Sequence, residues 1–349
     1  MKKNPSLTIA GRKIGLDYPP LVIAEIGINH GGSLAKAKRM VRDAKRAGAE
    51  FVKFQSHVVR DEMVESEARK TIPANSKVSI WEVIDECSLS EREERTLKRY
   101  TEKLGLVFLS TPFSRAAANR LQKMGVKAFK IGSGECNNYP LIEHVAKWKK
   151  PMIVSTGMNT IADIKETVRI MNKYKTPFAL LHCTNMYPTP YKDVNFGGLL
   201  EMKKVFPNTV LGFSNHSLGP WAALGAVALG ASILERHFVS DKSWRGNDVE
   251  VSMDPKELKV MLDGSRAIWE SRGGRKGPVK GEKPTIDFAF ASVVTIAPIK
   301  KGEKFSMKNL WAKRPGTGEL HAREFKKVLG KRARRDLKRD AQLRRGDVV

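Results

Sequence analysis

The stretch LVIAEIGINH, residues 21–30, is a short apolar run that ends in groups able to bind a charge or a metal, namely Glu25, Asn29 and His30. Nearly every later run of this kind also ends in such groups. The later runs are residues 51–54, 106–109, 127–131, 152–154, 178–181, 210–213 and 232–234. A (β/α)8 barrel has eight parallel strands and carries its chemistry at their C-terminal ends. The pattern therefore predicts an α/β protein of this class, a TIM barrel, with its active site on that rim.

The segments between these runs have the apolar spacing of amphipathic helices. In residues 34–47, for example, Met40, Val41 and Ala44 recur among lysines and arginines, and Gly48 follows as a stop signal. Further segments of this type cover residues 91–104, 116–124, 139–148, 161–174, 197–205, 220–229 and 255–269. Because strands and helices alternate, the sheet should be parallel. The connection over residues 57–90 is long for a barrel and is typical of a lid or binding loop.

The chain is too long for the barrel alone, since it has 349 residues and a barrel takes about 250. The stretch SRGGRKGPVKGEKPT, residues 271–285, is rich in Gly, Pro and Lys and is typical of a linker. We therefore predict a barrel domain over residues 1–270, a linker over 271–285 and a small domain over 286–349, with strands near 291–296 and 310–314. So small a module buries little apolar core, so we expect it to pack against the barrel or against a partner subunit.

The formal net charge is +26, and residues 272–349 carry 22 Lys and Arg against 8 Asp and Glu. The segment KRARR, residues 331–335, could contact nucleic acid, but no recognition motif accompanies it and a solvated basic surface is the simpler interpretation. We therefore expect no nucleic-acid partner. Three cysteines without CxxC spacing predict reduced thiols. No signal peptide or membrane-spanning run is evident, which predicts a cytoplasmic protein without a membrane partner.

His216 and His237 each follow an apolar run, and the two runs are consecutive. On a barrel rim their imidazoles should lie close together. Neutral imidazole suits divalent transition metals, and two ligands would leave positions open for water or substrate. The alternative is that either histidine satisfies an ordinary hydrogen bond.

Lys53 and Lys130 stand in otherwise apolar strand ends, FVKFQ and AFKIGSGE. A buried lysine is costly unless it meets an anion, so the pair predicts a site for phosphate and carboxylate. Backbone amides near Gly132 and Gly134 could approach the same anion. Polar side chains at neighbouring strand ends could complete the site or could simply cap helices. They are Thr111, Ser133, Ser155, Asn185 and Ser214.

Carboxylates on the same rim could act as general acid or base or hold a sugar hydroxyl, and Glu25 and Glu135 are the candidates. A structural ion pair is the alternative for either. Gln55, Tyr187 and Asp248 suit sugar hydroxyls but are weak signals by themselves.

Several motifs together resemble one family across almost the whole chain. They include IAEIGINHGGS (23–33), FVKFQSH (51–57), KIGSGECNNYPL (130–141), LLHCTNMYPTP (180–190), LGASILERHF (229–238) and LWAKRPGTG (310–318). They resemble the bacterial N-acetylneuraminate (sialic acid) synthases of the NeuB family. The resemblance implies a (β/α)8 TIM barrel followed by a small C-terminal SAF (antifreeze-like, β-clip) domain. It also implies a domain-swapped homodimer in which each SAF domain caps the active site of the partner.

The resemblance implies a transferase that condenses phosphoenolpyruvate with open-chain N-acetylmannosamine and water, giving N-acetylneuraminate and phosphate by C–O cleavage. His216 and His237 would bind a divalent metal, Mn²⁺ first, with Mg²⁺ or Co²⁺ as alternatives. The phosphoenolpyruvate set would be Lys53, Thr111, Lys130, Ser133, Ser155, Asn185 and Ser214. The amino-sugar set would be Glu25, Gln55, Glu135, Tyr187, Asp248, Phe288 and, in the partner's small domain, Arg314. The expected catalytic residues are Glu25, Lys53, Lys130, Glu135 and Arg314.

Two departures from the family pattern affect these expectations. Asn215 stands where the family usually has Asp beside the metal histidine, which could alter metal preference. The segment over residues 241–253 is one residue shorter than in related sequences, so Asp248 is the least secure assignment. The alternative is a related nonulosonic acid synthase of the legionaminate, pseudaminate or sialic acid 9-phosphate type. A sequence says little about a single substituent on the acceptor sugar, so it does not distinguish these enzymes well.

Overall fold

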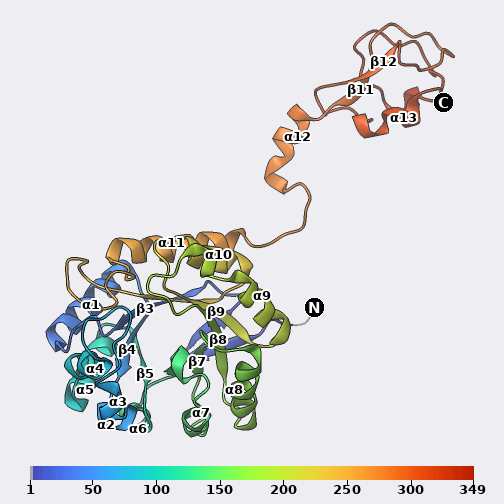
Figure 1. The fold of residues 1–349 in the computed structure, drawn as a ribbon. Helices are drawn as coiled ribbons and strands as arrows, with labels where there is room; N and C mark the ends of the chain where they lie inside the picture. The colour runs from blue at the N-terminus through green and yellow to red at the C-terminus, as the bar shows by residue number, and fades with distance from the viewer. Residues whose placement is uncertain (1–2) are drawn as a thin grey trace. The chain divides into compact units, whose positions relative to one another are not determined.

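The computed structural model describes residues 3–349, which form two compact units, the first ending at Gly273 and the second covering Gly274–Val349. The first unit contains eight parallel strands in the order β5-β4-β3-β10-β9-β8-β7-β6, and β5 and β6 at the two ends of this order also contact each other. The predicted (β/α)8 barrel is therefore confirmed (Figure 1). Its strands are β3 Leu21–Gly27, β4 Phe51–Ser56, β5 Val107–Pro112, β6 Phe129–Ile131, β7 Met152–Ser155, β8 Phe178–Cys183, β9 Val210–Asn215 and β10 Ile233–His237.

Helices surround this sheet (Figure 1). Helix α1 shows why they form: the Ser33 side chain caps its first turn by accepting from the Lys36 amide, and Gly48 ends it in the left-handed conformation at φ 102°. Its buried face carries Met40, Val41 and Ala44 against the outside of the strands. The helices are α1 Leu34–Ala47, α5 Glu91–Lys103, α6 Arg115–Met124, α7 Tyr139–Ala146, α8 Ile161–Lys173, α9 Phe196–Val205, α10 Trp221–Leu229 and α11 Pro255–Ser271.

The long connection after β4 is not irregular, because it folds into three short helices with a small core of its own around Trp81 and Ile84. These helices are α2 Val59–Glu62, α3 Glu65–Ala68 and α4 Ile80–Cys87. Single 3₁₀ turns follow β6 and β8, as η1 Ser133–Glu135 and η2 Tyr191–Asp193.

A hairpin that the sequence analysis did not predict closes the N-terminal end of the barrel. Its antiparallel strands are β1 Ser6–Ile9 and β2 Arg12–Gly15. Leu7, Ile9 and Ile14 pack in one cluster with residues such as Leu21 and Phe51, which begin barrel strands. The interior below the rim is thus apolar and closed, and a ligand must enter at the opposite, C-terminal end of the strands.

The second unit is small and has its own core around Val293, Phe305 and Leu310. A two-stranded antiparallel sheet pairs β11 Ser292–Thr295 with β12 Leu310–Lys313. The predicted linker, residues 271–285, is only partly irregular, since α11 extends to Ser271 and two helical elements begin within its second half. The remaining elements are η3 Lys280–Glu282, α12 Lys283–Ala289, η4 Ala322–Glu324, α13 Phe325–Val328 and η5 Arg345–Asp347. Within residues 3–349, no helix is both long and apolar enough to cross a lipid bilayer.

Candidate active site

Four charged side chains meet inside the barrel just below its rim. Side chains alternate along a strand, so Leu21, Ile23 and then Glu25 point inward from β3. The ammonium nitrogen of Lys53 lies 2.8 Å from Glu25 Oε1 and 3.9 Å from Glu235 Oε1. The ammonium nitrogen of Lys130 lies 3.4 Å from the same oxygen of Glu235. All four residues are buried, so two carboxylates neutralise two ammonium groups away from water.

Burial and these ion pairs act on the pKa values in opposite directions. Burial disfavours the ammonium form of Lys53, but the carboxylates of Glu235 and Glu25 outweigh burial and raise its pKa. For Lys130 burial prevails over the attraction of Glu235, and the pKa is lowered. Burial also opposes the carboxylate form of Glu235, yet Lys130 and Lys53 hold its pKa below the usual value. Glu235 is therefore ionised and shared between both lysines.

Hydroxyl groups from neighbouring strands bind these charges. Lys53 donates to Thr111 Oγ1 at 3.1 Å and Lys130 donates to Ser155 Oγ at 2.7 Å. Ser214 donates to Glu235 Oε1 at 3.3 Å. The caps of the helices that follow β5 and β7 are other residues, Ser114 and Thr160. Capping therefore does not explain why Thr111 and Ser155 stand at these strand ends.

A cavity of about 140 Å³ opens on this charged layer. Ser133 Oγ accepts from the Gly157 amide at 3.1 Å, and Asn185 Oδ1 accepts from the Cys183 thiol at 3.3 Å, which orients both side chains at the cavity wall. The sequence-predicted residues that line it are Glu25, Lys53, Gln55, Thr111, Lys130, Ser133, Ser155, Asn185, Tyr187, Ser214, His216 and His237. The strand ends thus bring most of the predicted site residues to one place.

The two histidines lie side by side on this wall, with ring centroids 5.6 Å apart. His216 Nδ1 is 2.9 Å from the carbonyl oxygen of Thr184, which can only accept, so Nδ1 carries the proton and Nε2 keeps a lone pair. His237 Nδ1 is buried without a hydrogen-bond partner, and the nearest carboxylate, Asp248 Oδ2, is 3.7 Å away. Burial lowers the pKa of both rings, so both are neutral near pH 7. Neutral rings with free lone pairs are suitable metal ligands.

No cluster of three or more His, Cys, Asp or Glu side chains that could hold a metal occurs within residues 3–349. An ion bound by His216 and His237 would need oxygen ligands from water or substrate. The Asn215 side chain does not contact these rings: its oxygen accepts from the Ser217 amide at 3.0 Å and hydroxyl at 2.8 Å. Its nitrogen faces the Ser217 carbonyl at 3.4 Å, so Asn215 holds the turn after β9.

The other residues that were predicted to bind the amino sugar do not all lie at the cavity wall. Tyr187 stacks on His216 with ring centroids 4.2 Å apart, and Gln55 donates to Glu25 Oε1 at 3.3 Å. Asp248 is buried behind His237 rather than at the cavity wall. Glu135 also does not line the cavity; it accepts from Asn138 at 2.6 Å, and burial raises its pKa.

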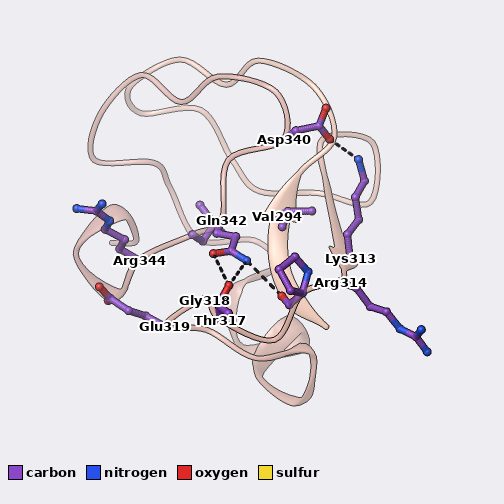
Figure 2. Close-up of a pocket in the computed structure, with 11 residues that line it drawn as sticks. Val294, Lys313, Arg314, Thr317, Gly318, Glu319, Asp340, Gln342 and Arg344 are labelled. Atoms are coloured by element: carbon purple, nitrogen blue, oxygen red, sulfur yellow. Dashed lines mark hydrogen bonds and ion pairs between the residues drawn. The ribbon is translucent and has the colours of Figure 1, made fainter. Parts of the chain in front are cut away.

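Phe288 and Arg314 belong to the second unit. The guanidinium carbon of Arg314 lies 5.7 Å from the centroid of the Phe288 ring, which is 67% exposed. Figure 2 shows the Arg314 side chain extending away from the neighbouring Lys313–Asp340 ion pair. No carboxylate within residues 3–349 forms an ion pair with Arg314. The unit therefore presents an unpaired guanidinium beside an exposed aromatic ring.

Three residues of the cavity wall were not predicted as site residues, namely Phe113, Cys183 and Glu235. The signal for Glu235 was present, because it lies two residues before His237 in ILERH and alternation turns both side chains inward. Phe113 and Cys183 have no comparable signal, since an aromatic ring or a lone thiol at a strand end is usually part of a core.

Comparison with known proteins agrees with this architecture. The model of the NeuB family matches residues 40–277, and that of the SAF domain matches residues 290–349. The N,N'-diacetyllegionaminic acid synthase of Campylobacter jejuni is 37% identical over 333 residues, which cover 93% of this chain and 98% of that protein. The human N-acetylneuraminate-9-phosphate synthase is 36% identical over 310 residues, covering 87% of this chain and 85% of that protein.

Among solved structures, the N-acetylneuraminic acid synthetase of Leptospira borgpetersenii, in complex with citrate, superposes with a TM-score of 0.74. It is 32% identical and covers 81% of this chain and 95% of that chain. The fold and rim thus define a TIM-barrel protein that carries a SAF domain. The chain belongs to the NeuB family.

The role of Glu235 as the shared counter-ion gives a prediction about stability. Replacing Glu235 by Gln leaves two buried ammonium groups with one carboxylate, so we expect the free energy of unfolding at pH 7 to fall by about 3 kcal/mol. The folded pKa of Glu235 is depressed, so its contribution is present above about pH 4.5 and is lost as the pH falls through the folded pKa. The difference between wild type and E235Q, measured by urea unfolding, should therefore shrink below pH 4.5.

The control is Glu67→Gln, because the Glu67–Lys70 pair is largely exposed and should contribute less than about 1 kcal/mol. A loss in E235Q no greater than in E67Q would contradict the assigned role.

Proposed function

We propose that this protein is a nonulosonic acid synthase that condenses phosphoenolpyruvate with N-acetylmannosamine and water, giving N-acetylneuraminate and phosphate. The observation that carries the proposal is the pair of buried lysines, Lys53 and Lys130, beside the neutral pair His216 and His237 in one cavity. Lysines surrounded by hydroxyl donors suit a small molecule with a carboxylate and a phosphate. The names of the relatives in Campylobacter, Leptospira and human support a synthase of this class.

The anion would bind by competing with the carboxylates for the two ammonium groups. Lys53 and Lys130 are already oriented by Thr111 and Ser155, so little side-chain ordering is needed when the anion binds. Ser133, Asn185 and Ser214 would supply further polar contacts from the same wall. Charge that develops on the departing phosphate would meet fixed donors in a site that excludes water.

His216 and His237 fit a divalent metal, because their rings are buried, neutral and adjacent, and His237 Nδ1 has no protein hydrogen bond. We propose Mn²⁺ as the ion, with Mg²⁺ or Co²⁺ as alternatives. When bound, the metal would supply Lewis acidity toward the acceptor aldehyde. Tyr187, stacked on His216, would pack against the acceptor and keep water from this side of the cavity.

The proposed reaction needs no oxidant or reductant. C3 of phosphoenolpyruvate attacks the aldehyde carbon, whose oxygen takes a proton and becomes a hydroxyl. Water adds at C2 and loses one proton, which balances the proton taken by the aldehyde oxygen. The new C2 hydroxyl loses the second proton as the C2–O bond breaks, so C2 becomes a ketone and the phosphate leaves with the bridging oxygen and takes up that proton. Glu135 is the proposed proton acceptor, because burial raises its pKa and makes its carboxylate a stronger base. Glu25, an acceptor of hydrogen bonds from Lys53 and Gln55, would hold an acceptor hydroxyl.

The second unit is proposed to complete the site of another subunit. Among residues 3–349 Arg314 has no acidic partner, and it lies over an exposed aromatic ring, a combination that suits a sugar or a carboxylate. We therefore propose a homodimer in which Arg314 and Phe288 cap the partner's barrel.

The identity of the acceptor sugar is tested by measuring turnover with three candidate sugars. With phosphoenolpyruvate and Mn²⁺, we expect phosphate release with N-acetylmannosamine to exceed that with its 6-phosphate or with a 2,4-diacetamido-trideoxy hexose. The CTNMYPTP motif and Gln55 favour the plain amino sugar. Faster turnover of either alternative would assign the enzyme to the corresponding related synthase, and no phosphate release with any of them would refute the proposed reaction.

The metal site is tested by binding as well as by activity. His237→Gln should weaken Mn²⁺ binding at least tenfold in titration calorimetry, because one of two protein ligands is lost. Since both folded pKa values lie below the usual 6.5, protons should compete with the metal only below that pH in wild type. His144→Gln, at a half-buried histidine bonded to Asn119, is the control. Unchanged binding in H237Q would remove His237 from the site.

Shared sites are tested by mixing two inactive variants. Lys53→Ala and Arg314→Ala should each abolish most turnover. In mixed dimers one of the two sites contains both wild-type residues, so activity should return toward a quarter of wild type after subunit exchange. Light scattering and a fluorescence exchange assay would establish the dimer and the mixing. No recovery after demonstrated exchange would place Arg314 in its own subunit's site or outside any site.

A further inference from the structure

The end of β4 continues into His57, a buried histidine whose ring contacts two residues of the cavity wall, Gln55 and Phe113. We propose that His57 is a positioning residue: clamped by Glu62, it donates from both ring nitrogens and fixes the amide of Gln55 toward the acceptor sugar. This inference rests on the proposed function, because Gln55 matters here as a contact to the acceptor.

The direction of each hydrogen bond in this chain follows from its two ends. Gln55 Nε2 lies 3.3 Å from Glu25 Oε1, and a carboxylate can only accept, so the amide nitrogen points toward Glu25. The amide oxygen of Gln55 is therefore the atom that faces His57 Nε2 at 3.2 Å, and Nε2 must donate to it. At the other end Glu62 Oε2 lies 2.8 Å from His57 Nδ1 and also accepts. Both ring nitrogens carry protons, so His57 is an imidazolium.

The ring and its backbone are held from several sides. His57 stacks on Phe113 with centroids 4.7 Å apart and an interplanar angle of 13°. Arg120 reaches the His57 carbonyl at 3.5 Å and the Glu94 carboxylate at 3.1 Å, while Glu94 accepts from Ser56 at 2.7 Å. His57 therefore has little freedom to turn, and the direction of its N–H bond is fixed.

The charges that face His57 come from five elements. Glu62 on α2 and Glu94 on α5 favour its charged form, and Glu25 on β3 acts through Gln55. Arg120 on α6 opposes it, whereas His30, which follows β3, adds no charge near pH 7 because burial lowers its pKa to about 4. A ring that carried only one proton would lose a donor to Gln55 or Glu62 and would leave the amide free to rotate. Acceptor binding should then weaken.

Nuclear magnetic resonance of the full chain labelled with ¹⁵N-histidine tests the charge without any substrate. The His57 signals, identified by their absence in His57→Gln, should show two protonated ring nitrogens at pH 7. In Glu62→Gln the carboxylate is lost while the side-chain shape is kept, so the spectrum should show one unprotonated ring nitrogen at pH 7. A His57 ring with one unprotonated nitrogen at pH 7 in wild type, or two protonated nitrogens in E62Q, would overturn the proposal.

Steady-state kinetics separate positioning from a merely structural role. In H57Q the KM for the amino sugar should rise roughly tenfold, the effect of losing one charge-assisted hydrogen bond, while the KM for phosphoenolpyruvate should change less than about twofold. In E62Q the KM for the amino sugar should also rise, because the ring loses the carboxylate that holds it. His144→Gln, which replaces a histidine bonded to Asn119 between α6 and α7, is the matched control and should leave both KM values unchanged.

Equal changes in both KM values, or a wild-type KM for the amino sugar in both E62Q and H57Q, would overturn the positioning role even if both variants fold. The two proposals can fail independently. If wild type releases no phosphate with any acceptor, the proposed reaction is wrong, whereas the nuclear magnetic resonance experiment still decides how the His57 ring is protonated.

Discussion

Two ammonium groups can be buried in one barrel only if carboxylates lie between them, and the rest of this site is arranged around that requirement. Glu235 lies within 3.9 Å of Lys53 and 3.4 Å of Lys130, and Glu25 pairs with Lys53 at 2.8 Å. The barrel meets the requirement by placing each charge on a different strand at the same level. The apolar residues below, sealed by the β1–β2 hairpin, keep water from the lower side of these pairs. The charges are therefore open to exchange with a ligand only from the rim.

The fold and much of the cavity wall could be predicted because both follow from one periodicity. Inward positions alternate along a strand, and the last inward residue of each strand reaches the rim. Lys53, Lys130 and His237 were found in this way, since a polar side chain in an apolar run is costly to bury unless it has a partner or a ligand. The same rule applies to Glu235, but carboxylates are common at strand ends. The role of Glu235 depends on its contacts with both lysines, which lie far away in sequence. Its role became evident only from the distances to their ammonium groups.

Features set by contacts between distant segments could not be predicted. The sequence of the β1–β2 hairpin shows that a turn is possible but not that Ile9 and Ile14 fill the bottom of the barrel. Asn215 seemed able to change the metal site, yet its side chain bonds to Ser217 because alternation turns it outward from β9. His57 carried no signal in FVKFQSH, since its ring meets Glu62 only after the following residues fold into α2. In each case the sequence identifies the residue but not the distant residue that it contacts in the fold.

Glu25 connects the two halves of the site. Its Oε1 accepts from Lys53 on the proposed anion side and from Gln55 on the proposed sugar side, and Gln55 Oε1 in turn lies 3.2 Å from Nε2 of His57. An anion that draws Lys53 away from Glu25 leaves this carboxylate with a free lone pair beside the sugar end of the cavity. Binding at the lysines would therefore make Glu25 a better acceptor for a sugar hydroxyl, while His57 and Glu62 keep Gln55 in place. In the proposed reaction, one carboxylate oxygen shared by an ammonium group and an oriented amide would therefore couple the binding of the two substrates.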